Sequence, residues 1–350
     1  MHASHYLCGG ARSFSQSSTR HRRNLLLTFD AFETLFYPSP PVPDQYAAIG
    51  HAFGLPKTVV TPKKLKAAFK DAFGTQSARY PNYGRADVLE GRYGGPKQWW
   101  EEVIRNSFAQ VLAQESSDGV SSTSVSCRGN TDLPSGMVGS LLNRFAGDGG
   151  YLLYDDVMPF FERMREIRAT SSSSGKPFDR IVVGVVSNSD DRISEVLKSL
   201  GLRVGCTRAD VDRSSTELPG FEEQVTRGAD RLEADSASMD AQQSTDLDMV
   251  ITSYEAGAEK PNRLIFDVAK RQAQRLVQQQ GSGFESNLAF SGETSDWACV
   301  HVGDDYQKDL IGATDAGWES FLLERGDGGK DPATTIRSLM DLLKRLQLDG

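Results

Sequence analysis

The segment LLLTFDAFETLF, residues 25–36, constrains the fold more than any other part of this chain. An apolar run of strand length leads into Asp30, and the chain then turns. In open α/β sheets, ligands and reactive groups lie just beyond the carboxyl ends of parallel strands. The segment alone is equally compatible with an ordinary strand followed by a polar turn, so the rest of the chain has to decide.

Apolar runs of strand length recur along the second half of the chain and alternate with amphipathic segments. The run IVVGVV at 181–186 is rich in β-branched residues, as are strands that are buried on both faces. We expect further strands at 249–252, 299–302 and 320–323, and a closing helix at 336–346. Alternating strands and helices form doubly wound sheets, so the sequence predicts a Rossmann-like α/β core of five parallel strands.

Between the first and second predicted strands, the chain has helical periodicity without strand alternation. Four closely spaced prolines after the first strand prevent a helix from crossing this boundary. We therefore predict a separate helical module over residues 44–150, inserted just after the first strand. The tryptophan pair at 99–100 lies on an amphipathic helix of this module, and we expect it in the core of the module.

The composition excludes several kinds of partner. Hydrophobic residues at 38% and charged residues at 25% are ordinary for a globular protein. The net charge of -8 disfavours nucleic acid and anionic membranes, because phosphate contacts need clustered lysine and arginine. No apolar stretch is long enough to span a bilayer. The four cysteines form no CxxC pair, which disfavours structural zinc and a disulfide framework. The composition does not indicate an oligomeric state.

Four segments have the composition of chain outside packed elements. Residues 1–23 contain four arginines and several serines but no aspartate or glutamate, which is typical of a mitochondrial transit peptide. A disordered basic tail is the alternative. We expect a location in the mitochondrial matrix, with the cytoplasm or nucleus as alternatives. The polar segments 115–136, 207–247 and 277–296 are expected to be solvated loops or insertions.

Four polar motifs follow or interrupt the apolar segments: FDAFET at 29–34, VVSNSD at 185–190, EKPNRLIF at 259–266 and HVGDDYQKD at 301–309. As a set and in this order, they resemble the haloacid dehalogenase-like hydrolase superfamily. The cap segments PNYG and QWW resemble one branch of it. The resemblance implies an α/β core made of 24–38 and 151–350, with its active site at the carboxyl ends of the strands, beneath a helical cap at 39–150.

The chemistry of the residue types fits that resemblance. A carboxylate such as Asp30 can attack phosphorus and form a covalent aspartyl-phosphate. Mg²⁺ prefers hard oxygen ligands, which Asp30, Asp304 and the backbone carbonyl of Phe32 would supply. Lys260 would place a positive charge beside the nucleophile and the transferring phosphoryl group. The resemblance thus implies a Mg²⁺-dependent phosphohydrolase that acts on a small phosphorylated metabolite.

The remaining motif residues have two interpretations each. Ser187 and Asn188 would bind phosphate oxygens, or they would cap the helix that follows. Asp309 would anchor Lys260 or complete the metal site through a bound water; alternatively, it is a turn or cap residue. His301 lies within a predicted strand, and we expect a core histidine there and not a ligand.

One departure limits the functional prediction. Phosphatases of the superfamily carry a second aspartate two residues after the nucleophile, and this chain has Phe32 there. That aspartate moves a proton, a contribution of roughly 10²–10⁴ in rate, so turnover is expected to be slow. Glu33 is expected to point away from the site. Two alternatives stay open: a non-catalytic or weakly catalytic binding protein, and a 2-haloacid dehalogenase, in which this position is also aromatic.

Overall fold

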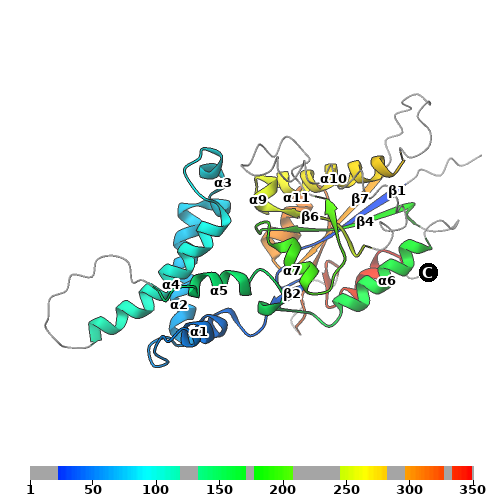
Figure 1. Cartoon of the computed structure of the whole chain (residues 1–350). Helices are drawn as coiled ribbons and strands as arrows, with labels where there is room; N and C mark the ends of the chain where they lie inside the picture. Colours follow the sequence, from blue (N-terminus) through cyan, green and yellow to red (C-terminus); the bar gives the residue numbers. More distant parts are fainter. Residues whose placement is uncertain are drawn as a thin grey trace, which may run out of the picture.

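A computed structural model describes residues 23–118, 133–170, 177–207, 245–281, 296–326 and 333–348. The predicted transit peptide lies outside these residues apart from Arg23, and so do most of the predicted insertions. Figure 1 shows a twisted central sheet with helices on both faces and a group of helices, coloured blue to green, that extends to one side.

The central sheet has seven strands in the order β5-β6-β4-β1-β7-β8-β9. All of their pairings are parallel, which confirms the predicted doubly wound α/β core. The strands are β1 (Arg23–Phe29), β4 (Arg180–Ser187), β5 (Val204–Thr207), β6 (Leu247–Thr252), β7 (Asp296–Gly303), β8 (Glu319–Leu323) and β9 (Thr335–Ile336). The predicted number of five was wrong, because β5 and β9 are short edge strands. The closing helix, α12, begins only at Met340.

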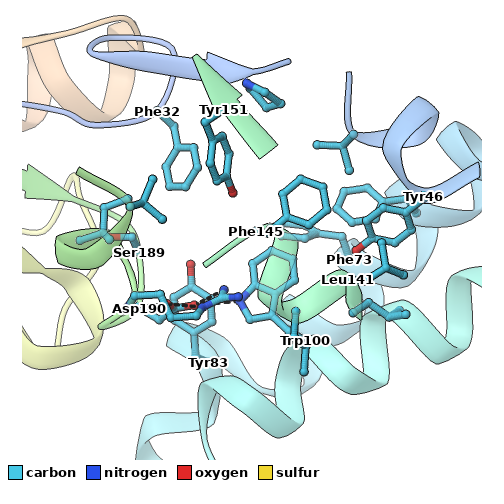
Figure 2. Close-up of a pocket in the computed structure, with 18 of the residues that line it drawn as sticks. Phe32, Tyr46, Phe73, Tyr83, Trp100, Leu141, Phe145, Tyr151, Ser189 and Asp190 are labelled. Carbon is cyan, nitrogen blue, oxygen red and sulfur yellow. Dashed lines mark hydrogen bonds and ion pairs between the residues drawn. The ribbon is translucent and has the colours of Figure 1, made fainter. Parts of the chain in front are cut away.

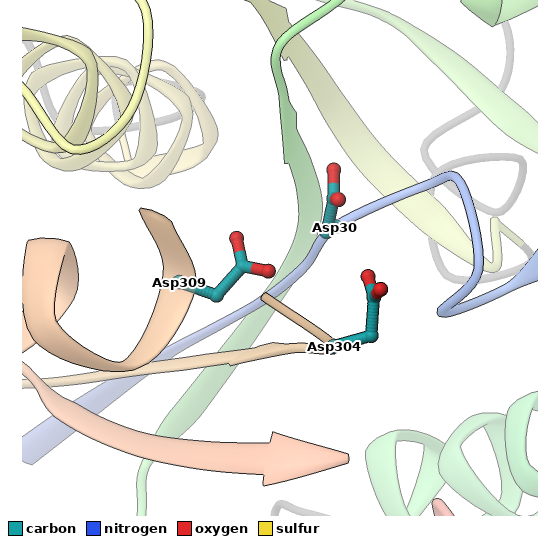
Figure 3. A group of neighbouring side chains, drawn as sticks. All are labelled: Asp30, Asp304 and Asp309. Atoms are coloured by element: carbon teal, nitrogen blue, oxygen red, sulfur yellow. The ribbon is translucent and has the colours of Figure 1, made fainter. Parts of the chain in front are cut away.

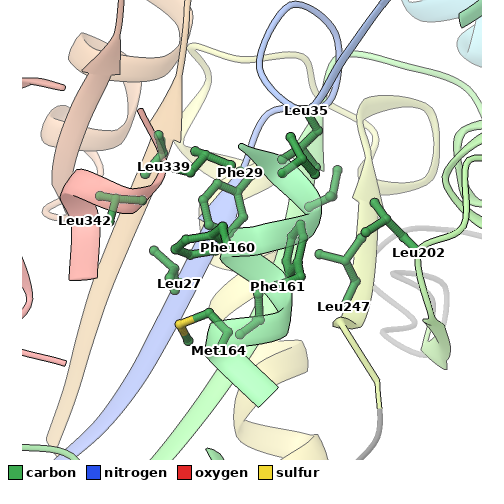
Figure 4. Packing of buried hydrophobic residues seen from close by; sticks show 14 of the residues in the cluster. Leu27, Phe29, Leu35, Phe160, Phe161, Met164, Leu202, Leu247, Leu339 and Leu342 are labelled. Carbon is green, nitrogen blue, oxygen red and sulfur yellow. The ribbon is translucent and has the colours of Figure 1, made fainter. Parts of the chain in front are cut away.

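Strand β1 lies in the middle of the sheet, between β4 and β7, and is buried from both sides. Leu25, Leu27 and Phe29 pack on one face with helices α6 (Val157–Ala169), α7 (Ile193–Ser199) and α12 (Met340–Arg345). The Phe29 ring meets the rings of Phe160 and Phe161 of α6 edge to face (Figure 4).

Leu26 points to the other face of the sheet and packs with helices α10 (Arg263–Gly281) and α11 (Gly312–Asp315). Alternate residues of β1 therefore bury apolar side chains in opposite layers, as expected for a strand with helices on both sides. This double burial fixes the position at which the strand ends, and with it the position of Asp30.

Residues 39–150, which we call the cap segment, lie between two short antiparallel strands, β2 (Phe36–Pro38) and β3 (Tyr151–Leu153). These strands hold the two ends of the cap segment side by side, and the sequence did not predict them. The segment contains α1 (Val42–Ala52), α2 (Pro62–Arg79), α3 (Pro81–Leu89), α4 (Pro96–Asp118), α5 (Met137–Arg144) and the short η1 (Asp148–Gly150).

The cap segment has an apolar cluster of its own, in which Tyr46, Leu65, Phe108 and Leu141 are buried. The boundaries of core and cap stay a prediction. None of the helices in the described ranges combines the length and the hydropathy needed to cross a bilayer.

Candidate active site

The predicted site residues meet at the carboxyl edge of the central sheet. Asp30 follows β1, Ser187 is the last residue of β4, and Asp304 follows β7. Lys260 lies between the short helix α9 (Ser253–Ala256), which follows β6, and α10. Asp309 lies in η5 (Tyr306–Ile311), and Figure 3 shows its carboxylate facing those of Asp30 and Asp304. Four neighbouring strands thus deliver groups that are far apart in sequence to one place.

Lys260 is the buried cation of the site. Its Nζ lies 3.0 Å from Asp30 Oδ1 and 2.6 Å from Asp309 Oδ1, and it donates to the Val186 carbonyl at 2.8 Å. Burial alone would lower the pKa of Lys260, but the carboxylates of Asp30 and Asp309 raise it above its ordinary value. The ammonium therefore stays charged beside the Asp30 carboxylate.

Asp309 holds Lys260 through a buried ion pair. Its carboxylate is fully buried, and it accepts hydrogen bonds from Lys260, from His301 Nε2 at 3.2 Å and from the backbone N–H of Asp305 at 3.0 Å. Asp309 is therefore more than a turn or cap residue, because its side chain accepts a hydrogen bond from Lys260.

His301 is a core histidine, as predicted, and it is fully buried. Burial lowers its pKa, which favours the neutral ring. With the proton on Nε2, the ring donates to Asp309 and accepts from Thr28 Oγ1 at Nδ1, 2.9 Å away. Sequence reasoning missed this link between the strand and Asp309. A polar residue inside an otherwise apolar buried strand was the available signal.

Carboxylate oxygens of Asp30, Asp304 and Asp309 lie within 4.8 Å of one another. Asp304 is exposed at the rim and accepts a hydrogen bond from Thr34 Oγ1 at 3.3 Å. Partial burial of its carboxyl group and the charges of Asp30 and Asp309 raise its pKa to about 6. Lys260 offsets only one of these three charges, so the donor set fits a hard divalent cation such as Mg²⁺. The Phe32 carbonyl as a further ligand stays a prediction.

Asn188 has a role that the sequence did not reveal. Its Oδ1 accepts from the backbone N–H of Lys260 at 2.6 Å, and its Nδ2 donates to the carbonyl of Lys260 at 3.0 Å. The Asn188 side chain therefore positions Lys260. The capping alternative for Ser187 and Asn188 is wrong, because α7 begins at Ile193 without a side-chain cap. Ser187 is buried at the strand end, where its predicted contact with phosphate stays a prediction.

Phe32 lies two residues after Asp30, at the position where this sequence lacks a proton-donating side chain. Its ring packs edge to face against Phe36 and Tyr151, with centroids 4.9 and 5.8 Å apart. Glu33 has a left-handed backbone, with φ of 57°, and its Oε2 accepts from Tyr154 at 2.9 Å. Glu33 is therefore bound to Tyr154 at the surface, and Phe32 contributes a hydrocarbon wall.

A cavity of about 280 Å³ adjoins the site where Phe32 and Asn188 form part of its wall. Figure 2 shows the rings of Phe32 and Tyr151 side by side, with further rings of the cap segment around the space. The aromatic residues that line it are Phe32, Tyr46, Phe69, Phe73, Tyr83, Trp100, Phe145 and Tyr151. Trp99 is buried in the cap as predicted, but Trp100 lines this cavity, so the prediction for the pair held only for the first.

Polar groups gather at one corner of the cavity. Arg192 forms a bidentate ion pair with Asp190, in which Nε donates at 2.9 Å and Nη2 donates at 2.7 Å. The Arg192 guanidinium also lies over the ring of Trp100. Trp100 Nε1 donates to Asp190 Oδ2 at 2.8 Å. These contacts join a helix of the cap segment to the loop after β4.

A strained turn makes a second connection between cap and core. Asn82, Tyr83 and Gly84, the last three residues of the PNYG motif, all have left-handed backbones, with φ of 47°, 59° and 74°. Asn82 Nδ2 donates to the Ser253 carbonyl at 2.8 Å, and the Tyr83 hydroxyl donates to the Asn188 carbonyl at 3.4 Å. Non-glycine residues in this region cost about 1–3 kcal/mol each, so the surrounding contacts have to hold them there.

The fold is a parallel, Rossmann-like α/β sheet with a helical insertion. Its carboxyl edge brings an aspartate, a buried lysine and two further carboxylates together, which defines a class of α/β proteins with a carboxylate–lysine site. A HAD-hydrolase-like family model matches residues 257–341, which include Lys260, Asp304 and Asp309. This family model and curated relatives that carry the name make the chain similar to the haloacid dehalogenase-like hydrolase superfamily.

Relatives are similar over most of the chain. An uncharacterized protein of Saccharomyces cerevisiae is 26% identical and covers 88% of this chain and 74% of its own length. Haloacid dehalogenase-like hydrolase domain-containing protein 3 of Homo sapiens is 25% identical, over 87% of this chain and 83% of its own length. Among solved structures, a magnesium-bound HAD-hydrolase from Bacillus subtilis is 13% identical, covers 93% of this chain and 99% of its own, and has a TM-score of 0.41.

Proposed function

We propose that this protein is a Mg²⁺-dependent phosphohydrolase that acts on a small phosphorylated metabolite through an aspartyl-phosphate on Asp30. One observation carries the proposal: the Asp30 carboxylate lies 3.0 Å from the buried Lys260 ammonium and beside Asp304, at the carboxyl ends of central strands. A nucleophile, a fixed cation and a second oxygen ligand are what phosphoryl transfer to a carboxylate requires.

Each residue has a separate task in this reaction. An oxygen of Asp30 attacks phosphorus, and Lys260 offsets the negative charge that gathers on the phosphoryl oxygens. Asp309 and Asn188 hold Lys260 from two sides, through its ammonium and its backbone. Asp30 and Asp304 would hold Mg²⁺, which when bound supplies further neutralisation of phosphate charge. Water then attacks phosphorus of the aspartyl-phosphate, which releases phosphate and restores Asp30.

Phe32 makes the first step demanding, because its side chain cannot protonate the leaving oxygen. The same residue favours the alternative of a weakly catalytic binding protein, since its ring is built into an aromatic cluster and not merely inserted at the surface. The dehalogenase alternative also fits an aromatic residue here. The dehalogenases of the superfamily use an arginine shortly after the first motif to bind the halide, however, and this chain has no arginine between Asp30 and Arg79.

Beryllofluoride binding tests the proposal, because beryllofluoride on an aspartate imitates the aspartyl-phosphate. We expect calorimetric titration of the full chain to show binding only when Mg²⁺ is present. Asp30→Asn should abolish this binding, whereas Asp315→Asn, the same change at an exposed position of α11, should preserve it. A folded wild-type chain that binds no beryllofluoride contradicts the proposal. Halide release from 2-chloropropionate would then support the dehalogenase alternative.

A further inference from the structure

The cavity beside the reactive site is built for hydrocarbon. Eight aromatic side chains line it, together with aliphatic ones from α1, α4, α5 and α7. The polar residues along the wall are Asn188, Ser189, Asp190 and Arg192, and three of the eight aromatic residues are tyrosines with a hydroxyl group, Tyr46, Tyr83 and Tyr151. A sugar or a polyol buried in such a space would find fewer partners than it has hydroxyl groups, and each unpaired group costs roughly 1–3 kcal/mol. The lining therefore disfavours polyhydroxylated substrates.

The one ion pair on the wall does not change this conclusion. Asp190 and Arg192 neutralise each other through two side-chain contacts, and Trp100 donates to the same carboxylate. Neither group is left to pair with a charged substituent of a ligand. The Ser189 hydroxyl differs from these groups, because it is 3% exposed, lines the cavity and has no hydrogen-bond partner within the described residues.

The volume limits the size of the occupant. An apolar cavity of about 150 Å³ holds benzene, so a cavity of about 280 Å³ accommodates one or two fused rings or a chain of similar volume. Flat rings also match the walls, because aromatic side chains pack favourably against other rings at offset or edge-to-face angles.

The missing proton donor points to the same class of molecule independently. Without an acid at position 32, the leaving oxygen departs as an anion. Aliphatic hydroxyl groups ionise near the pKa of water, about 15.7, whereas a phenolic hydroxyl ionises near ~10. A phenolate can therefore leave without being protonated, whereas an alkoxide needs a proton from a general acid. The lower pKa of the phenol thus replaces much of the rate enhancement of roughly 10²–10⁴ that a general acid supplies.

We propose, on the basis of the phosphohydrolase function above, that the substrate is a phosphate monoester of an apolar phenol. Its one or two rings lie in the aromatic cavity, and its phosphate lies at Asp30. An Asp30 oxygen forms a bond to phosphorus, and the bond from phosphorus to the phenolic oxygen breaks, with the electron pair leaving on that oxygen. The phenolate then takes a proton from water, and a second water hydrolyses the aspartyl-phosphate. Overall, the ester and water give the phenol and inorganic phosphate.

Four phosphate donors separate ring recognition from leaving-group effects in the full chain with Mg²⁺. We expect kcat/KM for 2-naphthyl phosphate to exceed that for glycerol 3-phosphate by about 100-fold or more, since burial of the rings and the better leaving group both contribute. 2-Naphthylmethyl phosphate, which keeps the rings but loses the phenolic oxygen, should fall between them. Acetyl phosphate, which has a good leaving group and no ring, is the reference. Glycerol 3-phosphate turned over as well as 2-naphthyl phosphate would overturn the inference.

A cavity-filling variant tests where the rings bind. Leu142 is half-buried on the cavity wall, and Leu142→Trp should lower kcat/KM for 2-naphthyl phosphate about tenfold more than for acetyl phosphate. The matched control is Leu152→Trp, because Leu152 is 51% exposed on β3 and its neighbour Tyr151 points into the cavity. The control should change neither value. Equal losses on both donors in Leu142→Trp would contradict the placement of the rings.

A binding measurement distinguishes this inference from the function on which it rests. Titration with 2-naphthol, followed by its fluorescence, needs no turnover. If no donor is hydrolysed but 2-naphthol binds to wild type about tenfold more tightly than to Leu142→Trp, the phosphohydrolase proposal fails and the aromatic site stands. If acetyl phosphate is hydrolysed and 2-naphthol does not bind, the function stands and the aromatic site is refuted.

Discussion

Replacing Asp309 by asparagine tests how the lysine of the site is held. The Asp309 carboxylate is fully buried: Oδ1 accepts from Lys260 at 2.6 Å and from His301 at 3.2 Å, and Oδ2 accepts from the Asp305 N–H at 3.0 Å. An asparagine side chain has one acceptor and one donor group. Whichever way its amide turns, the NH₂ group faces a donor in Asp309→Asn, and a buried donor is left without a partner.

The size of the effect follows from the partners that remain. Burial alone would raise the pKa of Asp309, but Lys260 and the hydrogen bond from His301 hold it well below its usual range. The surroundings as a whole therefore favour the charged carboxylate. Removing one partner of a buried ion pair costs about 3–5 kcal/mol. Because Lys260 keeps Asp30 at 3.0 Å and the Val186 carbonyl at 2.8 Å, we expect the lower end, a loss of about 3 kcal/mol.

Urea unfolding followed by tryptophan fluorescence measures this loss. A change of about 3 kcal/mol is a large part of the 5–15 kcal/mol that is usual for a folded protein. The control Asp315→Asn, at an exposed position, should stay within about 0.5 kcal/mol of wild type. Combining Asp309→Asn with Lys260→Met should cost less than the two single changes added together. A loss below about 1 kcal/mol in Asp309→Asn, or strict additivity in the double variant, would refute the account of the buried pair.

Two further predictions concern the strained turn of the cap segment and the ion pair between Asp190 and Arg192. Gly84→Ala should lower the free energy of unfolding by about 2 kcal/mol or more, since an added Cβ would lie 2.5 Å from the Tyr93 ring at a φ of +74°. Gly54→Ala, with a φ of +89° and no neighbouring atoms around the added Cβ, should lower it by about 1 kcal/mol. Equal shifts in Tm for the two variants would contradict the packing argument. Burial alone would raise the pKa of Asp190, but Arg192 holds it below its ordinary value, so its contribution to stability is present at neutral pH and lost below about pH 4. Thermal melts should therefore show a steeper fall of Tm on acidification for wild type than for Asp190→Asn, and parallel curves would refute the assignment.

Long periodic elements were predictable from the sequence, and short ones were not. The five predicted strands correspond to β1, β4, β6, β7 and β8, each of which contains an apolar run long enough to be recognised. Strand β9 has two residues and strand β5 has four, so neither shows a pattern that differs from a loop. Their pairing depends on the neighbouring edge of the sheet, which is a tertiary contact that local sequence does not encode.

The same limit applies to the site. The position of Asp30 was predictable, because a buried strand fixes where its last residue points. The contact of Asn188 with Lys260 joins residues 72 positions apart, and the contact of His301 with Asp309 depends on a turn within η5. The aromatic cavity depends on side chains from several helices of the cap segment, whose relative placement no single helix reveals.

Asn188 shows that the reactive site and the cavity are parts of one structure. Its side chain binds both backbone groups of Lys260, and its carbonyl accepts from the Tyr83 hydroxyl, which belongs to the strained turn of the cap segment. Asn188 and Tyr83 also line the cavity. A ring that fills the cavity would therefore contact Asn188, the residue that positions Lys260 beside Asp30. We infer that the occupant of the cavity and the geometry of the nucleophile are set together, which would make the hydrocarbon part of a substrate matter for the rate as well as for binding.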